Sequence, residues 1–181
     1  IDDQKKKEWE LREKSQKDSL TGLLNNFTIK QQIGARLQSL KRGQTGYLVV
    51  QDVDSFKKIN DTNGHLFGDA VLCSFADELS NIFPEALKGR IGGDEFVFYV
   101  EDMDREQLEE KLKQLNRCMS DRYDDDKTGL HISCSLGAAV TDGTVTDYNL
   151  LFQWADAALY QVKSKGKGAY YLLDVKEGVA L

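Results

Sequence analysis

Four acidic side chains lie beside two apolar runs, and three of them could share one metal site. Asp52 and Asp54 end one apolar run, and Asp94 and Glu95 directly precede another. Because side chains two residues apart lie on the same side of a strand, Asp52 and Asp54 should share a face. If the two segments are neighbours, Asp52 and Asp94 converge, with Glu95 nearby. Together with a strand-end carbonyl such as that of Val53, these oxygens suit Mg²⁺ or Mn²⁺. From spacing alone, two solvated acids at a strand end explain the pattern equally well.

The stretch from Arg90 to Phe96 reads Arg-Ile-Gly-Gly-Asp-Glu-Phe, which predicts a hairpin with carboxylates at its tip. We expect Gly92 and Gly93 to supply positive φ angles in a tight turn. Crowded carboxylates repel each other, and a divalent cation would remove that cost.

A second polar cluster runs from Phe56 to Asp69. Backbone N–H groups at a helix start after Asp54 can hold phosphate, and Lys57 adds a cation. Asn60 and Asp69 offer the mixed donors and acceptors that the edge of a guanine requires. The alternatives are a helix C-cap for Asn60 and a helix N-cap for Asp69.

A third cluster contains Lys163 and Lys167, which are four residues apart and therefore on one face of a predicted helix. Both could reach the outer phosphates of a nucleotide, although a solvated, lysine-rich helix end has the same pattern. The chain has no Walker A loop, and its two histidines and unpaired cysteines favour neither a catalytic triad nor a zinc site.

The elements that must position these residues alternate between helix and strand. The apolar spacing and the turn signals predict helices over 27–40, 56–60, 71–82, 108–119 and 146–165, and strands over 47–54, 96–100, 130–136 and 170–173. This alternation predicts one α/β domain.

Composition limits the function further. The chain has 181 residues and a net charge of −6, which argues against a nucleic-acid binder with a broad basic surface. It shows no transmembrane run or signal peptide, so we expect a cytoplasmic location with no membrane contact. Cys73, Cys118 and Cys134 lie in apolar patterns and should be buried, reduced thiols. Because the chain starts without Met, we expect a fragment of a longer protein.

Five segments resemble the GGDEF family of bacterial diguanylate cyclases in order and spacing. They are Asp18 to Asn25, Gln51 to Asp69, Arg90 to Phe96, Ser133 to Gly137, and Ala155 to Tyr160 followed by Lys163. The resemblance implies a five-stranded, mostly antiparallel central sheet wrapped by helices, as in the polymerase palm and adenylyl cyclases. We expect the polar residues 1–17, which contain no Gly or Pro, to form a linker helix or the end of a coiled coil that pairs two chains. The cyclase domain then spans 18–175 and a tail spans 176–181.

The resemblance also implies a reaction. Two GTP molecules, one on each protomer of a transient homodimer, are joined into cyclic di-GMP when each 3′-hydroxyl attacks the α-phosphorus of the other. It implies two Mg²⁺ (or Mn²⁺) ions for each site. By position, the ligands are Asp52, the Val53 carbonyl and Asp94, and Glu95 lies near the metals and the attacking hydroxyl. The implied substrate contacts are Phe56, Lys57, Asn60, Asp69, Lys163 and Lys167.

Some positions depart from the family pattern. Asn26, Ile91 and Lys167 stand where Arg, Tyr and Arg are common, and Lys cannot form the two-pronged phosphate contact of Arg. Residues Phe83 to Ala86 replace an inhibitory Arg-x-x-Asp, so we expect no feedback binding of cyclic di-GMP there. We expect an absent sensory region to act through the N-terminal helix of a parent that could be membrane-attached. The rival hypothesis is a non-catalytic GGDEF domain that binds GTP and relays a signal.

Overall fold

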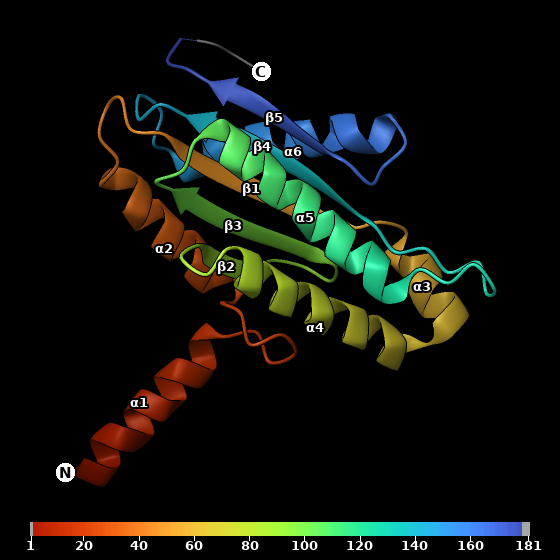
Figure 1. Ribbon diagram of the computed structural model, residues 1–181. Helices are drawn as coiled ribbons and strands as arrows, with labels where there is room; N and C mark the ends of the chain where they lie inside the picture. Colours follow the sequence, from red (N-terminus) through yellow and green to blue (C-terminus); the bar gives the residue numbers. More distant parts are fainter. Residues whose placement is uncertain (1, 179–181) are drawn as a thin grey trace.

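The computed structural model describes residues 2–178, which form a five-stranded sheet with helices on both faces (Figure 1). The sheet order is β2-β3-β1-β4-β5, and every neighbouring pair is antiparallel except β4 and β5. This confirms the predicted α/β class and its mostly antiparallel sheet. In chain order the elements are α1 (Asp2–Gln16), α2 (Asn26–Gln38), β1 (Gly46–Val53), α3 (Phe56–Asn63), α4 (His65–Ile82), β2 (Leu87–Arg90), β3 (Glu95–Glu101), α5 (Arg105–Tyr123), β4 (Cys134–Thr141), α6 (Tyr148–Ser164) and β5 (Tyr170–Val175).

Each face of the sheet has its own apolar core, because alternate strand residues point to opposite faces. One core joins the sheet to α3, α4 and α5, and contains Val49, Phe75 and Phe98. The other joins it to α2 and α6, and contains Val50, Ile33 and Trp154. The side chain of Asp52, two residues after Val50, therefore lies on the face of the sheet that α6 covers.

Helix α6 lies unusually close to the sheet at Gly137. A Cβ atom at this position would lie 2.2 Å from both the Ala155 carbonyl oxygen and the Leu159 nitrogen. Only glycine permits this approach, because the clash would be with backbone that cannot rotate away. The close packing fixes the end of α6 that carries Lys163.

The predicted strand over 130–136 is wrong at its start, since β4 begins at Cys134 and extends to Thr141. The backbone N–H of Ile132 donates to the Asp124 carboxylate, and that of Cys134 donates to the Asn116 side chain. These side chains accept hydrogen bonds from backbone N–H groups that a regular β-ladder would use. The buried run from Gly137 to Thr141 does not alternate with polar residues, so the alternation rule did not find it.

The thiol prediction holds fully only for Cys134. Cys134 is buried, whereas Cys73 and Cys118 are half-buried, and all three are free thiols. Burial raises the pKa of each thiol above its ordinary value. A thiol with a raised pKa is a poor nucleophile at neutral pH, so none of the three has the character of a reactive cysteine.

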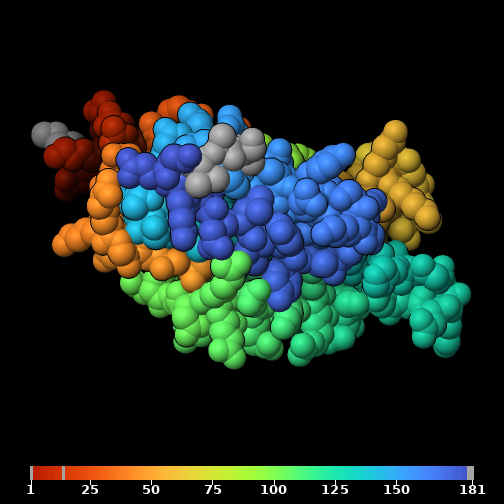
Figure 2. Space-filling model, turned by 90° about the horizontal axis from the view of Figure 1, so that it is seen from above, coloured from red at the N-terminus to blue at the C-terminus, as the bar shows by residue number. Residues whose placement is uncertain are grey.

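Helix α1 projects from the body of the molecule, while α3 and the segment after α5 stand out at the opposite end (Figures 1 and 2). Helix α1 covers nearly all of the residues 1–17 that were expected to be helical, and its role as a linker stays a prediction. Ile1 and part of the predicted tail, residues 179–181, lie outside the described residues. Between residues 2 and 178, no helix combines the length and the apolar character needed to cross a membrane.

Candidate active site

The predicted acidic cluster lies at one end of the sheet, where β1 ends and β3 begins. Asp52 is paired with Glu95 in the antiparallel ladder, so the two side chains share the face toward α6. The backbone N–H of Val53 donates to the Asp94 carbonyl at 3.3 Å. The two strands are thus neighbours, which is the arrangement on which the predicted convergence of Asp52 and Asp94 depended.

Arg90 shapes the hairpin that carries Asp94. Its guanidinium donates to the Gly93 carbonyl at 2.7 and 3.0 Å and to the carboxylate of Asp18 at 3.1 and 3.2 Å. Neither glycine of the hairpin has a positive φ angle, so that expectation was wrong. At Gly92 a Cβ atom would instead lie 3.2 Å from a carboxylate oxygen of Glu95, so this glycine leaves room for the acid beside it.

Burial and neighbouring carboxylates both disfavour the ionised forms of Asp94 and Glu95. Burial raises the pKa of Asp94, with a further increase from Asp54. Burial also raises the pKa of Glu95, followed by the neighbouring charges of Asp94 and Asp156. A nearby cation would reverse these effects by stabilising the ionised carboxylates.

One cation is already present in the cluster, because the ammonium of Lys163 contacts Asp52 Oδ2. The other oxygen, Asp52 Oδ1, is buried and has no hydrogen-bond partner. Such an oxygen is costly to bury unless it has a ligand. Across residues 2–178, no three His, Cys, Asp or Glu side chains are grouped closely enough to hold a metal ion. The donor chemistry fits a hard divalent cation, provided that Lys163 releases Asp52.

Asp54 has a different environment although it lies only two residues away. It is 8% exposed, and its carboxylate accepts hydrogen bonds from Ser133 Oγ at 2.6 Å, Ser135 Oγ at 2.6 Å and the Gly168 N–H at 3.0 Å. These donors come from the entry to β4, from β4 itself and from the segment after α6. Asp54 therefore ties three parts of the chain together at the edge of the site.

The start of α3 is available to a phosphate group. Ser55 precedes the helix with φ 54°, and its side chain makes no cap hydrogen bond, so the first N–H groups of the helix lack a side-chain partner. Lys57 is exposed in the first turn. Lys167 donates to Ser55 Oγ at 3.2 Å. The expectation that Lys163 and Lys167 share a helix face was wrong, because α6 ends at Ser164 and Lys167 has φ 67°.

The two residues predicted to read guanine lie on adjoining helices. Asn60 is inside α3 and Asp69 is inside α4, so the capping alternatives were wrong for both. Asn60 packs against Gly68, where a Cβ atom would lie 1.8 Å from its Oδ1 and 3.2 Å from the ring of Phe56. Asn60 Oδ1 is buried without a hydrogen-bond partner. A polar atom held in this way suits a ligand that supplies the missing donor.

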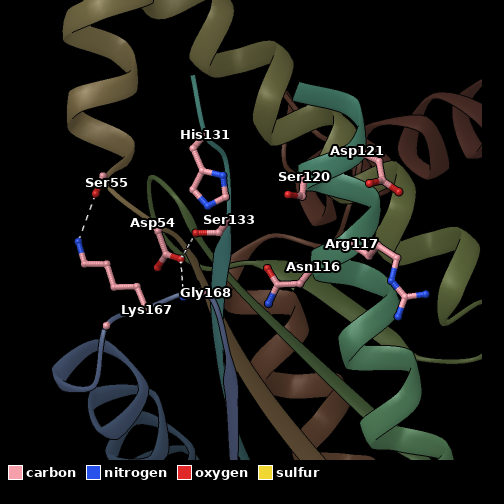
Figure 3. Close-up of a pocket in the computed structure, with 11 residues that line it drawn as sticks. Asp54, Ser55, Asn116, Arg117, Ser120, Asp121, His131, Ser133, Lys167 and Gly168 are labelled. Atoms are coloured by element: carbon pink, nitrogen blue, oxygen red, sulfur yellow. Dashed lines mark hydrogen bonds between the residues drawn. The ribbon is translucent and has the colours of Figure 1, made fainter. Parts of the chain in front are cut away.

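A cavity of about 530 Å³ adjoins these residues (Figure 3). In this view Lys167 and Ser55 lie on one side of the cavity and Asn116 enters from α5 on the other. Asp54 and Ser133 lie between them. None of the acids Asp52, Asp94 and Glu95 lines it. Of the predicted site residues the cavity contains only Lys167, so it lies beside the acidic cluster and is distinct from it.

Sequence reasoning missed the roles of three residues. Asp54 acts as a tie between segments, Arg90 holds the hairpin against Asp18, and Asp156 adds charge beside Glu95. The partners of each residue are distant in the chain, so spacing carried no signal for them. The strand register, the place of α6 and the contact of the segment before α2 with β2 bring them together.

Comparison with known proteins identifies the class. Residues 15–169 match the family model described as "Diguanylate cyclase, GGDEF domain". The chain therefore belongs to the GGDEF family, a family of diguanylate cyclase domains.

Several relatives are informative. The chain is 30% identical over 164 residues to the probable diguanylate cyclase DgcT of Escherichia coli, covering 88% of this chain and 36% of that protein. It is 35% identical over 159 residues to the diguanylate cyclase DgcS of Shewanella oneidensis, covering 86% and 52%. It is also 29% identical over 171 residues to the cyclic di-GMP phosphodiesterase PdeR of Escherichia coli, covering 94% and 26%. The chain thus spans about a quarter to a half of these relatives.

Among solved structures, the coiled coil and GGDEF domain of DgcB from Caulobacter crescentus, in complex with c-di-GMP, aligns with a TM-score of 0.86 and 25% identity. The alignment covers 95% of this chain and 93% of that one. The active GGEEF domain of a diguanylate cyclase from Vibrio cholerae aligns with a TM-score of 0.74 and 25% identity, covering 85% and 99%.

Proposed function

We propose that this domain is a diguanylate cyclase that condenses two GTP molecules into cyclic di-GMP and releases two pyrophosphates. The observation that carries the proposal is the group of acids Asp52, Asp94 and Glu95, which the pairing of β1 with β3 brings to one end of the sheet. Each 3′-hydroxyl oxygen loses its proton to solvent and forms a bond to the α-phosphorus of the opposite GTP. The bond from that phosphorus to the oxygen that bridges it to the β-phosphorus breaks, and the electron pair leaves with pyrophosphate.

Asp52, the Val53 carbonyl and Asp94 would hold Mg²⁺ or Mn²⁺, with two ions for each site. Bound there, divalent cations stabilise negative charge on the attacking and leaving oxygens. Glu95 faces the same side as Asp52, which supports a role in accepting a hydrogen bond from the attacking hydroxyl. Its half-buried position supports this role, because a carboxylate with little solvent contact interacts more strongly with a nearby polar group.

The remaining predicted residues bind the nucleotide. Lys57, Lys163, Lys167 and the start of α3 contact phosphate oxygens. Asn60 and Asp69 bind the guanine edge beside Phe56, where the unpartnered amide oxygen of Asn60 supports base recognition. A carboxylate that accepts from guanine N1–H and N2–H would disfavour adenine, which lacks that pair of donors.

The proposed reaction requires two protomers, since each contributes one GTP. We also propose that cyclic di-GMP does not bind where relatives have the Arg-x-x-Asp motif. Phe83 occupies this position at 2% exposure and packs on the ring of Phe98 at 4.9 Å. The nearby ammonium of Lys88 is turned toward the carbonyls of Phe83 and Pro84, at 2.8 and 3.3 Å. These contacts support an apolar anchor at this position instead of an anion site.

The alternative is a GTP-binding signalling module without cyclase activity. The similarity to PdeR, which is named a phosphodiesterase, is the observation that favours it. The test is incubation with GTP and Mg²⁺ followed by chromatographic detection of cyclic di-GMP, beside the Asp94→Ala, Glu95→Ala double variant. We expect product only from the unmodified domain. GTP binding without product, even with the chains artificially paired, would support the signalling module.

A further inference from the structure

Lys163 and Asp52 form an ion pair at the position where the proposed function requires a metal. The ammonium contacts Asp52 Oδ2, and the two side chains are 39% and 9% exposed. The same lysine is a proposed phosphate contact. While Lys163 remains paired with Asp52, its ammonium is not available to bind a phosphate oxygen.

The surroundings of Asp52 explain why the pair forms. Asp52 Oδ1 is buried without a partner, and Glu95 lies directly across the ladder. Asp94 and Asp156 add further negative charge around Glu95. A carboxylate in this setting is strongly destabilised unless a cation lies against it.

Lys163 can leave this position without any change of fold. It lies in the last turn of α6, whose place on the sheet is fixed by the contact at Gly137. Its four-carbon stem rotates freely, so the ammonium can move between partners while the helix stays in place.

We propose that Lys163 is an exchangeable counter-ion, which holds Asp52 in the metal-free domain and transfers to the nucleotide phosphates when the metal binds. The proposal rests on the proposed function, because it assumes that the same site takes a divalent metal and a triphosphate. Metal alone must displace the ammonium and leave it without a partner. When metal and a triphosphate bind together, the metal pairs with the Asp52 carboxylate and the ammonium of Lys163 pairs with a phosphate oxygen.

The exchange makes the two ligands cooperative. Because coupling between two binding sites is reciprocal, the nucleotide strengthens metal binding by the same factor by which the metal strengthens nucleotide binding. Removing the ammonium should remove the part of this coupling that depends on the exchange. Replacing Lys163 with an uncharged residue therefore has opposite effects on the two ligands. The metal, added without nucleotide, binds more tightly, whereas the nucleotide binds more weakly.

The experiment is a Mn²⁺ titration, with unbound Mn²⁺ measured by electron paramagnetic resonance, in the absence and presence of a non-hydrolysable GTP analogue. The variants are Lys163→Met, which keeps the length of the stem, and the control Lys165→Met. Lys165 follows the same helix but lies over the ring of Tyr171, at 5.6 Å from its centroid. A thermal melt of each variant verifies that it is folded.

We expect Lys163→Met to bind Mn²⁺ alone about tenfold more tightly than the unmodified domain, within the usual range of coupling between sites. The control should behave as the unmodified domain does. The gain should disappear in the Asp52→Asn, Lys163→Met double variant, because it acts through the Asp52 carboxylate. Unchanged, weaker or undetectable Mn²⁺ binding by Lys163→Met would overturn the proposal.

Metal binding and product formation are measured separately, so the two proposals can fail separately. The expected Mn²⁺ shift in a domain that makes no cyclic di-GMP would reject the cyclase and keep the exchange. Product formation without the shift would reject the exchange and keep the cyclase.

Discussion

The two aspartates at the end of β1 should respond in opposite ways to the same substitution. Asp54 accepts three hydrogen bonds, two from residues around the start of β4 and one from the segment after α6. Figure 3 shows those from Ser133 and Gly168. Asp52 has one ionic partner, Lys163, and one buried oxygen without a partner. Replacement by Asn keeps the size of each side chain and removes its charge, so the pair forms a matched comparison of structure and function.

The expected magnitudes follow from these contacts. A hydrogen bond to a charged group contributes about 1.5–3 kcal/mol and a neutral one about 0.5–1.5 kcal/mol. Asp54→Asn weakens three such bonds by about 1 kcal/mol each, so unfolding should become easier by about 3 kcal/mol. For a chain of this length, this lowers the melting temperature by roughly 6–12 °C. Asp52→Asn loses a partly exposed ion pair of about 0–1 kcal/mol and also relieves a buried charge, so its stability should stay within about 1 kcal/mol.

Urea denaturation of the two variants, together with cyclic di-GMP formation at a temperature where both are folded, tests this contrast. We expect Asp54→Asn to be destabilised yet to retain measurable activity, and Asp52→Asn to be stable and inactive. Equal losses of stability would refute the division of roles. An Asp52→Asn variant with full activity would refute the assignment of Asp52 to the metal.

Three further predictions concern the surroundings of the site. Gly68→Ala should leave the free energy of unfolding unchanged or raise it by up to about 1 kcal/mol, since alanine favours a helix. It should weaken GTP binding about tenfold, because the new methyl group displaces the Asn60 amide. A thermal melt and a GTP titration measure the two effects, and unchanged affinity would contradict the role of Asn60. Gly137→Ala should cost about 3 kcal/mol in urea denaturation because its methyl group would meet the backbone of α6, and a loss below about 0.5 kcal/mol would show that the close approach is not required. Burial opposes a low pKa for the carboxyl of Asp18, but hydrogen bonds from Thr21 and the Arg90 guanidinium outweigh it and lower that pKa. A carboxyl group whose pKa is lower in the folded state stabilises the fold above its unfolded pKa of about 3.9, and this stabilisation is lost as the pH falls through the folded pKa. Asp18→Asn should therefore lower the melting temperature at pH 7, and lower it by less at pH 3. An equal decrease at both pH values would count against the ion pair with Arg90.

The fold was predictable where periodicity was strong. The apolar spacing of Leu108, Leu112 and Leu115 marked α5, and the run from Tyr47 marked β1. The entry to β4 was not predictable, because the side chains of Asp124 and Asn116 take backbone donors there. These interactions join residues that are 8 and 18 positions apart, beyond the reach of a local pattern.

The sequence indicated which residues belong to the site, but it indicated less about how their side chains are arranged. The segments carrying Asp52 and Asp94 do adjoin, since β1 pairs with β3. The contact between Lys163 and Asp52 was not foreseen, because it joins residues 111 positions apart and depends on how closely α6 lies on the sheet. The angles at Gly92 and Gly93 were predicted wrongly, because Arg90 supplies the hydrogen bonds that hold the turn.

The most direct test of the account is the initial rate of cyclic di-GMP formation from GTP and Mg²⁺ as the concentration of the domain is raised. Below the dissociation constant of the dimer, the amount of active dimer rises with the square of the protein concentration. We therefore expect the rate to increase about fourfold for each doubling of protein, and the Asp94→Ala, Glu95→Ala variant to give no product. A rate strictly proportional to protein at every concentration would contradict the transient two-protomer reaction, and no product at any concentration would contradict the cyclase itself.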